Sequence, residues 1–243
     1  TPEDVASTQL DDAQAFHRKF YTPANAVLSI AGDINPDDAF QRAEEQFGNI
    51  GSPPEPIHRT AFDPSDLQRG SHVTELDAVP ASAVYISMHL PGTHDDRILT
   101  ADLVSSLLGV GKASVLYQEL VSRKQIASYV GTFIDRRAHS SLFTLYAHAT
   151  DENILADDLV QELAGAFKGA KVSAADMERA VNRQQTALAM ELQKTGGVAD
   201  SVAFHATFMN DASEVNRLLD KYGAITRDDV NGMVEDLADT SEW

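Results

Sequence analysis

"LLGVGKASVLYQELVSRKQIASYVGTF", residues 107–133, carries more information about the fold than any other part of the chain. It has the pattern of a helix end, a glycine-containing turn, an amphipathic helix and then a strand. Glycine commonly ends a helix because it adopts backbone conformations that other residues avoid. We therefore expect Gly109, Gly111 and Ser114 to form a tight turn between two helices.

The same turn begins like a phosphate-binding loop, and the residues around it argue against that alternative. A Walker loop needs a glycine five residues before its Gly-Lys pair and a Ser or Thr directly after the lysine. Ser106 and Ala113 occupy these positions. The dinucleotide-binding pattern needs a third glycine where Ser114 stands, and it needs a preceding strand where the periodicity is helical. Lys112 is then expected to lie in solvent.

Apolar and polar residues alternate in four segments, which predicts strands. In one of them the apolar residues from Val84 to Leu90 alternate with Tyr85, Ser87 and His89, so one face is expected to be buried. The expected strands are 71–77, 82–90, 126–135 and 141–149, the last two paired around a turn at 136–139. Helices are expected on both sides of the glycine turn and over 155–167, 173–192, 198–208, 212–222 and 227–238. This order predicts an α+β fold, with an antiparallel or mixed sheet and helices packed on one face.

The first fifty residues form a separate part. They predict a helix over 9–20, a strand within 24–34, and a second helix that begins after Asn35 and ends at Gly48. We expect this second helix to bury Phe40, Ala43 and Phe47. The proline-rich residues 49–68 that follow have no apolar periodicity and are typical of a linker.

Composition restricts the classes of function. The formal net charge is −18, which disfavours binding to nucleic acid. The chain has no cysteine, so it can form neither a disulfide nor a thiolate zinc site. Its sequence shows no membrane span and no signal peptide, so a signal for export would lie outside it. The acidic surface also suggests the hypothesis of a salt-adapted source, in which salt screens the self-repulsion.

Two motifs resemble the insulinase-like, or M16, zinc metallopeptidases. "FHRKFYTPANAVLSIAGDINPDDAFQRAEEQFGNI", residues 16–50, resembles the end of the family's first domain, and residues 107–133 resemble the central motif of its metal-free second domain. The resemblance implies a tail of a preceding domain over residues 1–48, a linker over 49–68, and a non-catalytic domain over 69–243 that stops before its last strand. A bacterial source is expected, with a periplasmic or cytoplasmic location left open.

The family's zinc site is missing from this sequence. It requires H-x-x-E-H, in which two histidines on one helical face bind Zn²⁺ and the glutamate activates water. No two of the eight histidines have that spacing, and Pro-Gly separates His89 from His94, the nearest pair. We therefore assign no catalytic residue, metal ligand or cofactor to this chain. The resemblance implies that zinc is bound by the catalytic half of the parent protein.

The family's second domain also supplies an Arg and a Tyr that hold the substrate carbonyl. Alignment on the motif places Val121 and Ser128 at these positions, and neither can replace the original side chain. Arg123 and Tyr129 lie nearby, so Ser128, Tyr129 and Arg123 are the candidate substrate-binding residues. A shift of one residue turns a strand side chain to the opposite face. Tyr129 is therefore expected to pack under the helices.

Two functions are consistent with these residues. The chain is either the non-catalytic half of a zinc peptidase, forming one wall of a peptide chamber beside a catalytic M16 domain or subunit, or a structural subunit resembling the core proteins of the cytochrome bc1 complex. A zinc motif in the upstream or neighbouring reading frame would favour the first.

An internal repeat suggests a further partner. Residues from Gln9 align with those from Thr226, but the second copy stops where the first continues into a strand. We therefore hypothesise that Val27 to Ile34 adds to the second domain's sheet, within one chain or by strand exchange in a homodimer.

Overall fold

The structure is a computed structural model that describes residues 2–52, 57, 63, 67 and 70–239. The chain divides into two compact units. Unit 1 comprises residues 1–62 and 191–215, and unit 2 comprises residues 63–190 and 216–243. The domain boundaries that the sequence predicts remain a prediction. The two units are described separately below.

Unit 1 is helical in the residues that the structure describes. The polar side chain of Asn35 accepts a hydrogen bond of 2.9 Å from the Asp37 backbone N–H, which fixes the start of one helix. The expected helices over 9–20 and 35–48 are confirmed. Its elements are α1 (Pro2–Ser7), α2 (Leu10–Phe20), η1 (Pro23–Asn25), α3 (Pro36–Phe47), α7 (Thr195–Phe208) and η4 (Ala212–Asn216), whose last residue lies in unit 2.

Two expectations for unit 1 are wrong. Residues 24–34 contain no strand, because the extended segment after η1 has no ladder of backbone hydrogen bonds to a neighbour. Phe40 and Phe47 are not buried by α3, since 75% of Phe40 and 47% of Phe47 is exposed. The proposed addition of Val27 to Ile34 to a sheet remains a prediction.

Unit 2 is built on a three-stranded antiparallel sheet in the order β1-β3-β2. Its strands are β1 (Ala83–Pro91), β2 (Ala127–Asp135) and β3 (Ser140–Ala149). The turn predicted at 136–139 joins β2 to β3, and the alternating burial of β1 is confirmed. The expected strand over 71–77 is wrong, because those residues have no ladder partner. A strand depends on such a partner as well as on its own alternation.

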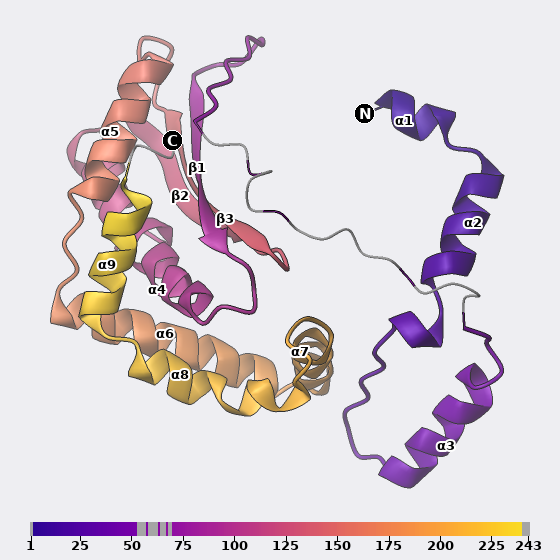
Figure 1. Cartoon of the computed structure of the whole chain (residues 1–243). Helices are drawn as coiled ribbons and strands as arrows, with labels where there is room; N and C mark the ends of the chain where they lie inside the picture. The colour runs from indigo at the N-terminus through magenta and orange to yellow at the C-terminus, as the bar shows by residue number, and fades with distance from the viewer. Residues whose placement is uncertain (1, 53–56, 58–62, 64–66, 68–69, 240–243) are drawn as a thin grey trace. The chain divides into compact units, whose positions relative to one another are not determined.

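The helices of unit 2 cover one face of the sheet, as Figure 1 shows for α4, α5 and α9. Apolar side chains from this face and from the helices form the core, with Phe143, Leu145, Leu103, Leu163 and Phe167 fully buried. The α+β architecture with helices on one face is thereby confirmed. The helices are α4 (Arg97–Gly109), the π-helix η3 (Tyr117–Arg123), α5 (Ala156–Lys168), α6 (Ala174–Leu192), α8 (Leu218–Ala224) and α9 (Arg227–Leu237).

The two glycines of the opening motif have different roles. Gly111 has a φ of +84°, a left-handed conformation that favours glycine, and it makes the turn after α4. Gly109 instead ends α4 against β2, where an added Cβ would lie 2.5 Å from the backbone nitrogen of Thr132. Ser114 is buried after the turn, and its hydroxyl has no hydrogen-bond partner among the described residues.

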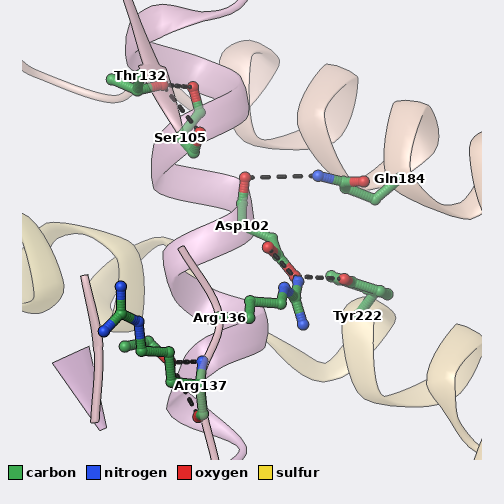
Figure 2. Close-up of polar contacts among 8 residues, drawn as sticks. Asp102, Ser105, Thr132, Arg136, Arg137, Gln184 and Tyr222 are labelled. Atoms are coloured by element: carbon green, nitrogen blue, oxygen red, sulfur yellow. Dashed lines mark hydrogen bonds and ion pairs between the residues drawn. The ribbon is translucent and has the colours of Figure 1, made fainter. Parts of the chain in front are cut away.

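A buried polar network ties α4 to the C-terminal helices and to the turn after β2 (Figure 2). The Arg136 guanidinium donates to both carboxylate oxygens of Asp102, and the Tyr222 phenol donates to one of them at 2.7 Å. The Gln184 side chain donates to the Asp102 backbone carbonyl at 3.4 Å. Burial lowers the pKa of Arg136, but the charge and hydrogen bond of Asp102, together with Tyr222, outweigh this effect and the pKa is raised. Arg136 therefore keeps its proton and its positive charge.

Candidate functional site

Aromatic rings gather on the face of the unit 2 sheet opposite the buried core. The antiparallel register places Tyr85 of β1 opposite Tyr146 of β3, and Gly131 of β2 opposite the same tyrosine. Tyr129 and Phe133 flank Gly131 on β2. We call Tyr85, Tyr129, Phe133 and Tyr146 the aromatic face. Its exposed fractions are 60% for Tyr85, 55% for Tyr129 and 47% for Phe133, which are high for large rings in a sheet.

Tyr146 lies at the centre of the aromatic face. Its ring centroid is 5.9 Å from Tyr85, 5.6 Å from Tyr129 and 6.0 Å from Phe133. Gly131 makes this position available, because a Cβ there would lie 2.4 Å from the Tyr146 hydroxyl. The ring therefore extends over the bare backbone of β2 and reaches Tyr129, to whose hydroxyl it donates a hydrogen bond of 3.4 Å.

Polar groups surround the rings. His148 Nε2 lies 3.3 Å from the Tyr85 hydroxyl, and the imidazole ring has edge contacts with Tyr129 and Tyr146. Partial burial, followed by the hydrogen bond to Tyr129, raises the pKa of Tyr146 to about 12. The phenol is consequently protonated and able to donate a hydrogen bond at neutral pH.

Two of the sequence-predicted residues lie beside each other at one end of this face. The expectation that Tyr129 packs under the helices is wrong. The ladder is irregular between Ala127 and Tyr129, and this bulge restores Tyr129 to the outward face. The Ser128 hydroxyl donates to the β3 carbonyls of Ala149 at 3.1 Å and His148 at 3.3 Å. Ser128 is thus engaged with its own sheet.

The third predicted residue, Arg123, lies elsewhere in unit 2. It ends the π-helix η3 and forms an ion pair with Glu119, whose hydrogen bond raises the pKa of Arg123. Both side chains line a cleft of about 790 Å³, together with residues of α5 such as Ala166. Neither Ser128 nor Tyr129 lines this cleft. The structure therefore brings two of the three candidates together and leaves Arg123 at another site.

Unit 1 contains a large apolar hollow among its described residues. A cavity of about 1180 Å³ is lined mainly by side chains of α2, the extended segment after it, and α3. Its rings include Phe16, Phe20, Tyr21, Phe40 and Phe47. Thr22 also lines it, with a buried hydroxyl that has no hydrogen-bond partner among the described residues. Most of these rings are substantially exposed, so this apolar surface is uncovered.

Neither a metal centre nor a membrane helix is found among the described residues. Within that part of the chain, no three His, Cys, Asp or Glu side chains are grouped so that they could hold a metal ion. His89 instead contacts the Ser140 hydroxyl at 3.3 Å across the sheet. None of the described helices combines the length and apolar character needed to cross a bilayer.

Unit 2 is therefore an α+β domain whose sheet is covered by helices on one face and bears exposed rings on the other. Comparison with known proteins identifies its family. The chain belongs to the family described as the peptidase M16 inactive domain, whose model matches residues 7–184. The resemblance inferred from the two sequence motifs is thus confirmed.

Individual relatives agree with this assignment. The zinc protease PqqE of Helicobacter pylori is 26% identical over 203 residues, which cover 81% of this chain and 45% of that protein. A crystal structure of a protease from Helicobacter pylori has the same fold, with a TM-score of 0.88 and 22% identity over 99% of this chain and 58% of that one. The chain thus spans about half the length of such relatives.

A second solved structure has the same fold in a different setting. A chain of Complex III2 from Candida albicans, with Inz-5 bound, gives a TM-score of 0.76 and 18% identity over 97% of this chain and 58% of that chain. At this level of identity the likeness concerns the fold alone.

Proposed function

We propose that this chain is the non-catalytic half of a zinc peptidase and that its aromatic face forms one wall of a peptide-binding chamber. The observation that carries the proposal is the exposed ring cluster on the side of the sheet away from the core. Rings give a large contact area with little loss of side-chain freedom, which suits a surface that holds extended peptides. Membership of the M16 inactive-domain family supports the same role.

In this function the chain binds and orients the peptide, and the catalytic half cleaves it. A peptide held on the wall is presented in one orientation to the catalytic half, so binding offsets part of the entropic cost of the reaction. Zinc in that half would supply the activation of water. Zinc and the general base are assigned to that other half. Tyr129 is the candidate that contacts substrate, because its ring and hydroxyl are exposed. Ser128 supports the bulge beside it, and Arg123 is assigned no contact with the same peptide.

The catalytic half is also the proposed cover of the apolar surface of unit 1. Phe16 of α2 and Phe40 of α3 are exposed by 57% and 75%, and both line the large cavity. Burying apolar area is favourable by about 25 cal/mol per Å². A partner that covers these rings would therefore form a complex that this burial stabilises. The sequence assigns this segment to the end of a preceding M16 domain, which is consistent with contact to that domain.

Reconstitution tests the proposal. The catalytic half, identified by H-x-x-E-H in the neighbouring or upstream reading frame, is expressed separately and mixed with this chain. We expect zinc-dependent peptide cleavage in the mixture and none by this chain alone. Tyr129→Leu should raise KM by about threefold to tenfold with little change in kcat, since it removes binding made equally in the ground and transition states. Tyr129→Phe, which keeps the ring, is the matched control. A catalytic half that is equally active without this chain would contradict the proposal.

A second function, that of a structural subunit, is favoured by two observations. The fold is shared with a chain of Complex III2, and Val121 and Ser128 stand where peptidases of the family carry Arg and Tyr. Such a subunit would form a stable complex in which Tyr129→Leu changes neither assembly nor any peptidase activity. The same reconstitution separates the two functions.

A further inference from the structure

We infer that the aromatic face selects peptides with cationic side chains, arginine above all, by stacking guanidinium groups on its exposed tyrosine rings. This inference rests on the proposed chamber wall and names the class of peptide that the wall prefers.

The charge of the surface supports this choice. None of the three strands contains a Lys or an Arg, so no ammonium or guanidinium group on the strands competes for the rings. The strands carry a single carboxylate, Asp135, which is paired with Arg137 of the adjacent turn. The whole chain has a formal net charge of −18. A cationic peptide is therefore attracted over a distance, whereas an acidic peptide is repelled.

The rings supply the short-range part of the recognition. The face of an aromatic ring carries partial negative charge, and arginine is the cation that stacks on it most often. The planar guanidinium is also more weakly hydrated than an ammonium group, so it loses less hydration free energy when it contacts a ring. Tyr85 and Tyr146 are nearly parallel, with an interplanar angle of 22° and centroids 5.9 Å apart. That spacing leaves no room for a planar group between them, so the guanidinium lies on their outer faces.

The spacing of the rings fits an extended peptide. Neighbouring centroids on either side of Tyr146 are 5.9 Å and 5.6 Å away, at Tyr85 and Tyr129. Side chains on the same side of an extended chain repeat about every 6.6 to 6.8 Å. Arginines at alternate positions can therefore contact successive rings at the same time.

Nucleic-acid bases also stack on aromatic sheet faces, but the surroundings here disfavour them. Proteins that bind single strands combine the rings with a basic groove that follows the phosphates. The strands of this sheet carry no Lys or Arg, and the chain is strongly acidic. A cationic peptide is the ligand that satisfies both the rings and the charge.

The test is an NMR titration of the full chain, which measures binding even at millimolar dissociation constants. The probe is the peptide acetyl-Ser-Arg-Ser-Arg-Ser-Arg-Ser-amide, and its neutral counterpart has citrulline in place of each arginine. Titrations are run at about pH 8, where free histidine is neutral. The salt is about 0.5 M NaCl, which shortens the screening length to about 4 Å and suppresses attraction by the distant acidic surface.

We expect the arginine peptide to bind at least about fivefold more tightly than the citrulline peptide, since each exposed cation–π contact contributes a factor of about two to five. The double variant Tyr85→Leu, Tyr129→Leu should lose this preference, and Tyr85→Phe, Tyr129→Phe should keep it. Tyr21→Leu is the matched control, because it removes a similarly exposed tyrosine from unit 1. Far-UV circular dichroism establishes that each variant is folded.

The other outcomes are distinguishable. If both peptides bind equally and the leucine variant weakens the binding of both, the result supports the peptide-binding wall and contradicts the selection of cationic peptides. A preference for arginine that survives in the leucine variant is general attraction to an acidic protein and overturns the inference. Tighter binding of an oligothymidine than of the peptide also overturns it. Binding of neither peptide overturns the inference and the proposed wall together.

Discussion

The phenol of Tyr222 donates a hydrogen bond of 2.7 Å to the carboxylate of Asp102, a residue 120 positions earlier in the chain. The same carboxylate accepts from Arg136, so one buried acid on α4 holds both α8 and the turn between β2 and β3 (Figure 2). Burial, followed by the charge of Asp102, raises the pKa of Tyr222, which keeps the phenol a donor. The ion pair between Asp102 and Arg136 thereby fixes the turn between the two strands that carry most of the aromatic face.

Asp102→Asn should lower the free energy of unfolding by about 2 to 4 kcal/mol. The substitution keeps the shape but leaves Arg136, whose side chain is 35% exposed, without the counter-charge of the buried Asp102, and removing one partner of a partly buried pair is costly. Guanidinium denaturation followed by circular dichroism measures the change. Asp135→Asn is the control, because the Asp135–Arg137 pair is exposed and such pairs contribute about 0 to 1 kcal/mol. Equal effects of the two substitutions would show that burial of the network contributes nothing.

Gly109→Ala should destabilise unit 2 by about 1 to 3 kcal/mol, since the added Cβ would overlap the backbone of Thr132. The steric overlap lies where α4 packs on β2, so thermal unfolding should show a lower melting temperature for the variant. Gly165→Ala in α5 is the matched control. Its Cβ meets no atom within 4 Å, and replacing a helical glycine by alanine should stabilise by up to about 1 kcal/mol. Stabilisation by both changes would contradict the packing role of Gly109.

Tyr146 should titrate near pH 12, above the ordinary tyrosine pKa of 10.0. Tyr129→Phe removes the hydroxyl that accepts its hydrogen bond, so the pKa should fall while partial burial keeps it above 10.0. Because the folded-state value is raised, the associated stabilisation is fully present below pH 10 and is lost as the pH rises toward 12. The shift of the labelled tyrosine Cζ measures the titration. Tyr21→Phe should leave it unchanged, and an unaltered pKa in Tyr129→Phe would contradict the assigned bond.

The start of α9 allows a test at acidic pH. Thr226 and Asp229 form a capping box in which the carboxylate accepts from the Thr226 hydroxyl at 2.6 Å, and this bond lowers the pKa of Asp229. The stabilisation is therefore present above pH 3.8 and is lost as the pH falls through the folded-state pKa. Thr226→Ala should return the pKa of Asp229 toward 3.8, measured by carboxyl-carbon NMR. Asp176 is the internal control: its own capping partner Ser173 lowers its pKa, and this pKa should not change in Thr226→Ala.

Local patterns in the sequence predict the strands and helices of unit 2 well. The alternation from Val84 to Leu90 identifies the buried face of β1, and the turn at 136–139 identifies the hairpin. The segments 71–77 and 24–34 show the limit of this reasoning. Alternation indicates an extended backbone, but a strand also requires a partner that only the tertiary fold supplies.

The candidate site is less accessible from sequence, because it depends on register and on long-range contacts. The aromatic face can be recognised only when the register of β1, β2 and β3 is known. Two local signals point to parts of it: Tyr85 alternates with the buried residues of β1, and Tyr146 lies on the second strand of the predicted hairpin. A bulge at Ser128 reverses the expected direction of Tyr129. No local pattern connects Asp102 with Tyr222.

The absence of a side chain at Gly131 also has an evolutionary consequence. Since a Cβ at this position would meet the Tyr146 hydroxyl at 2.4 Å, a side chain at position 131 and a ring extended across β2 exclude each other. Homologues should therefore change these two positions together: those with alanine or a larger residue at 131 should carry a small or differently oriented residue at 146. Such covariation would trace how the lineage acquired or abandoned its ring surface, independently of any measurement on this chain.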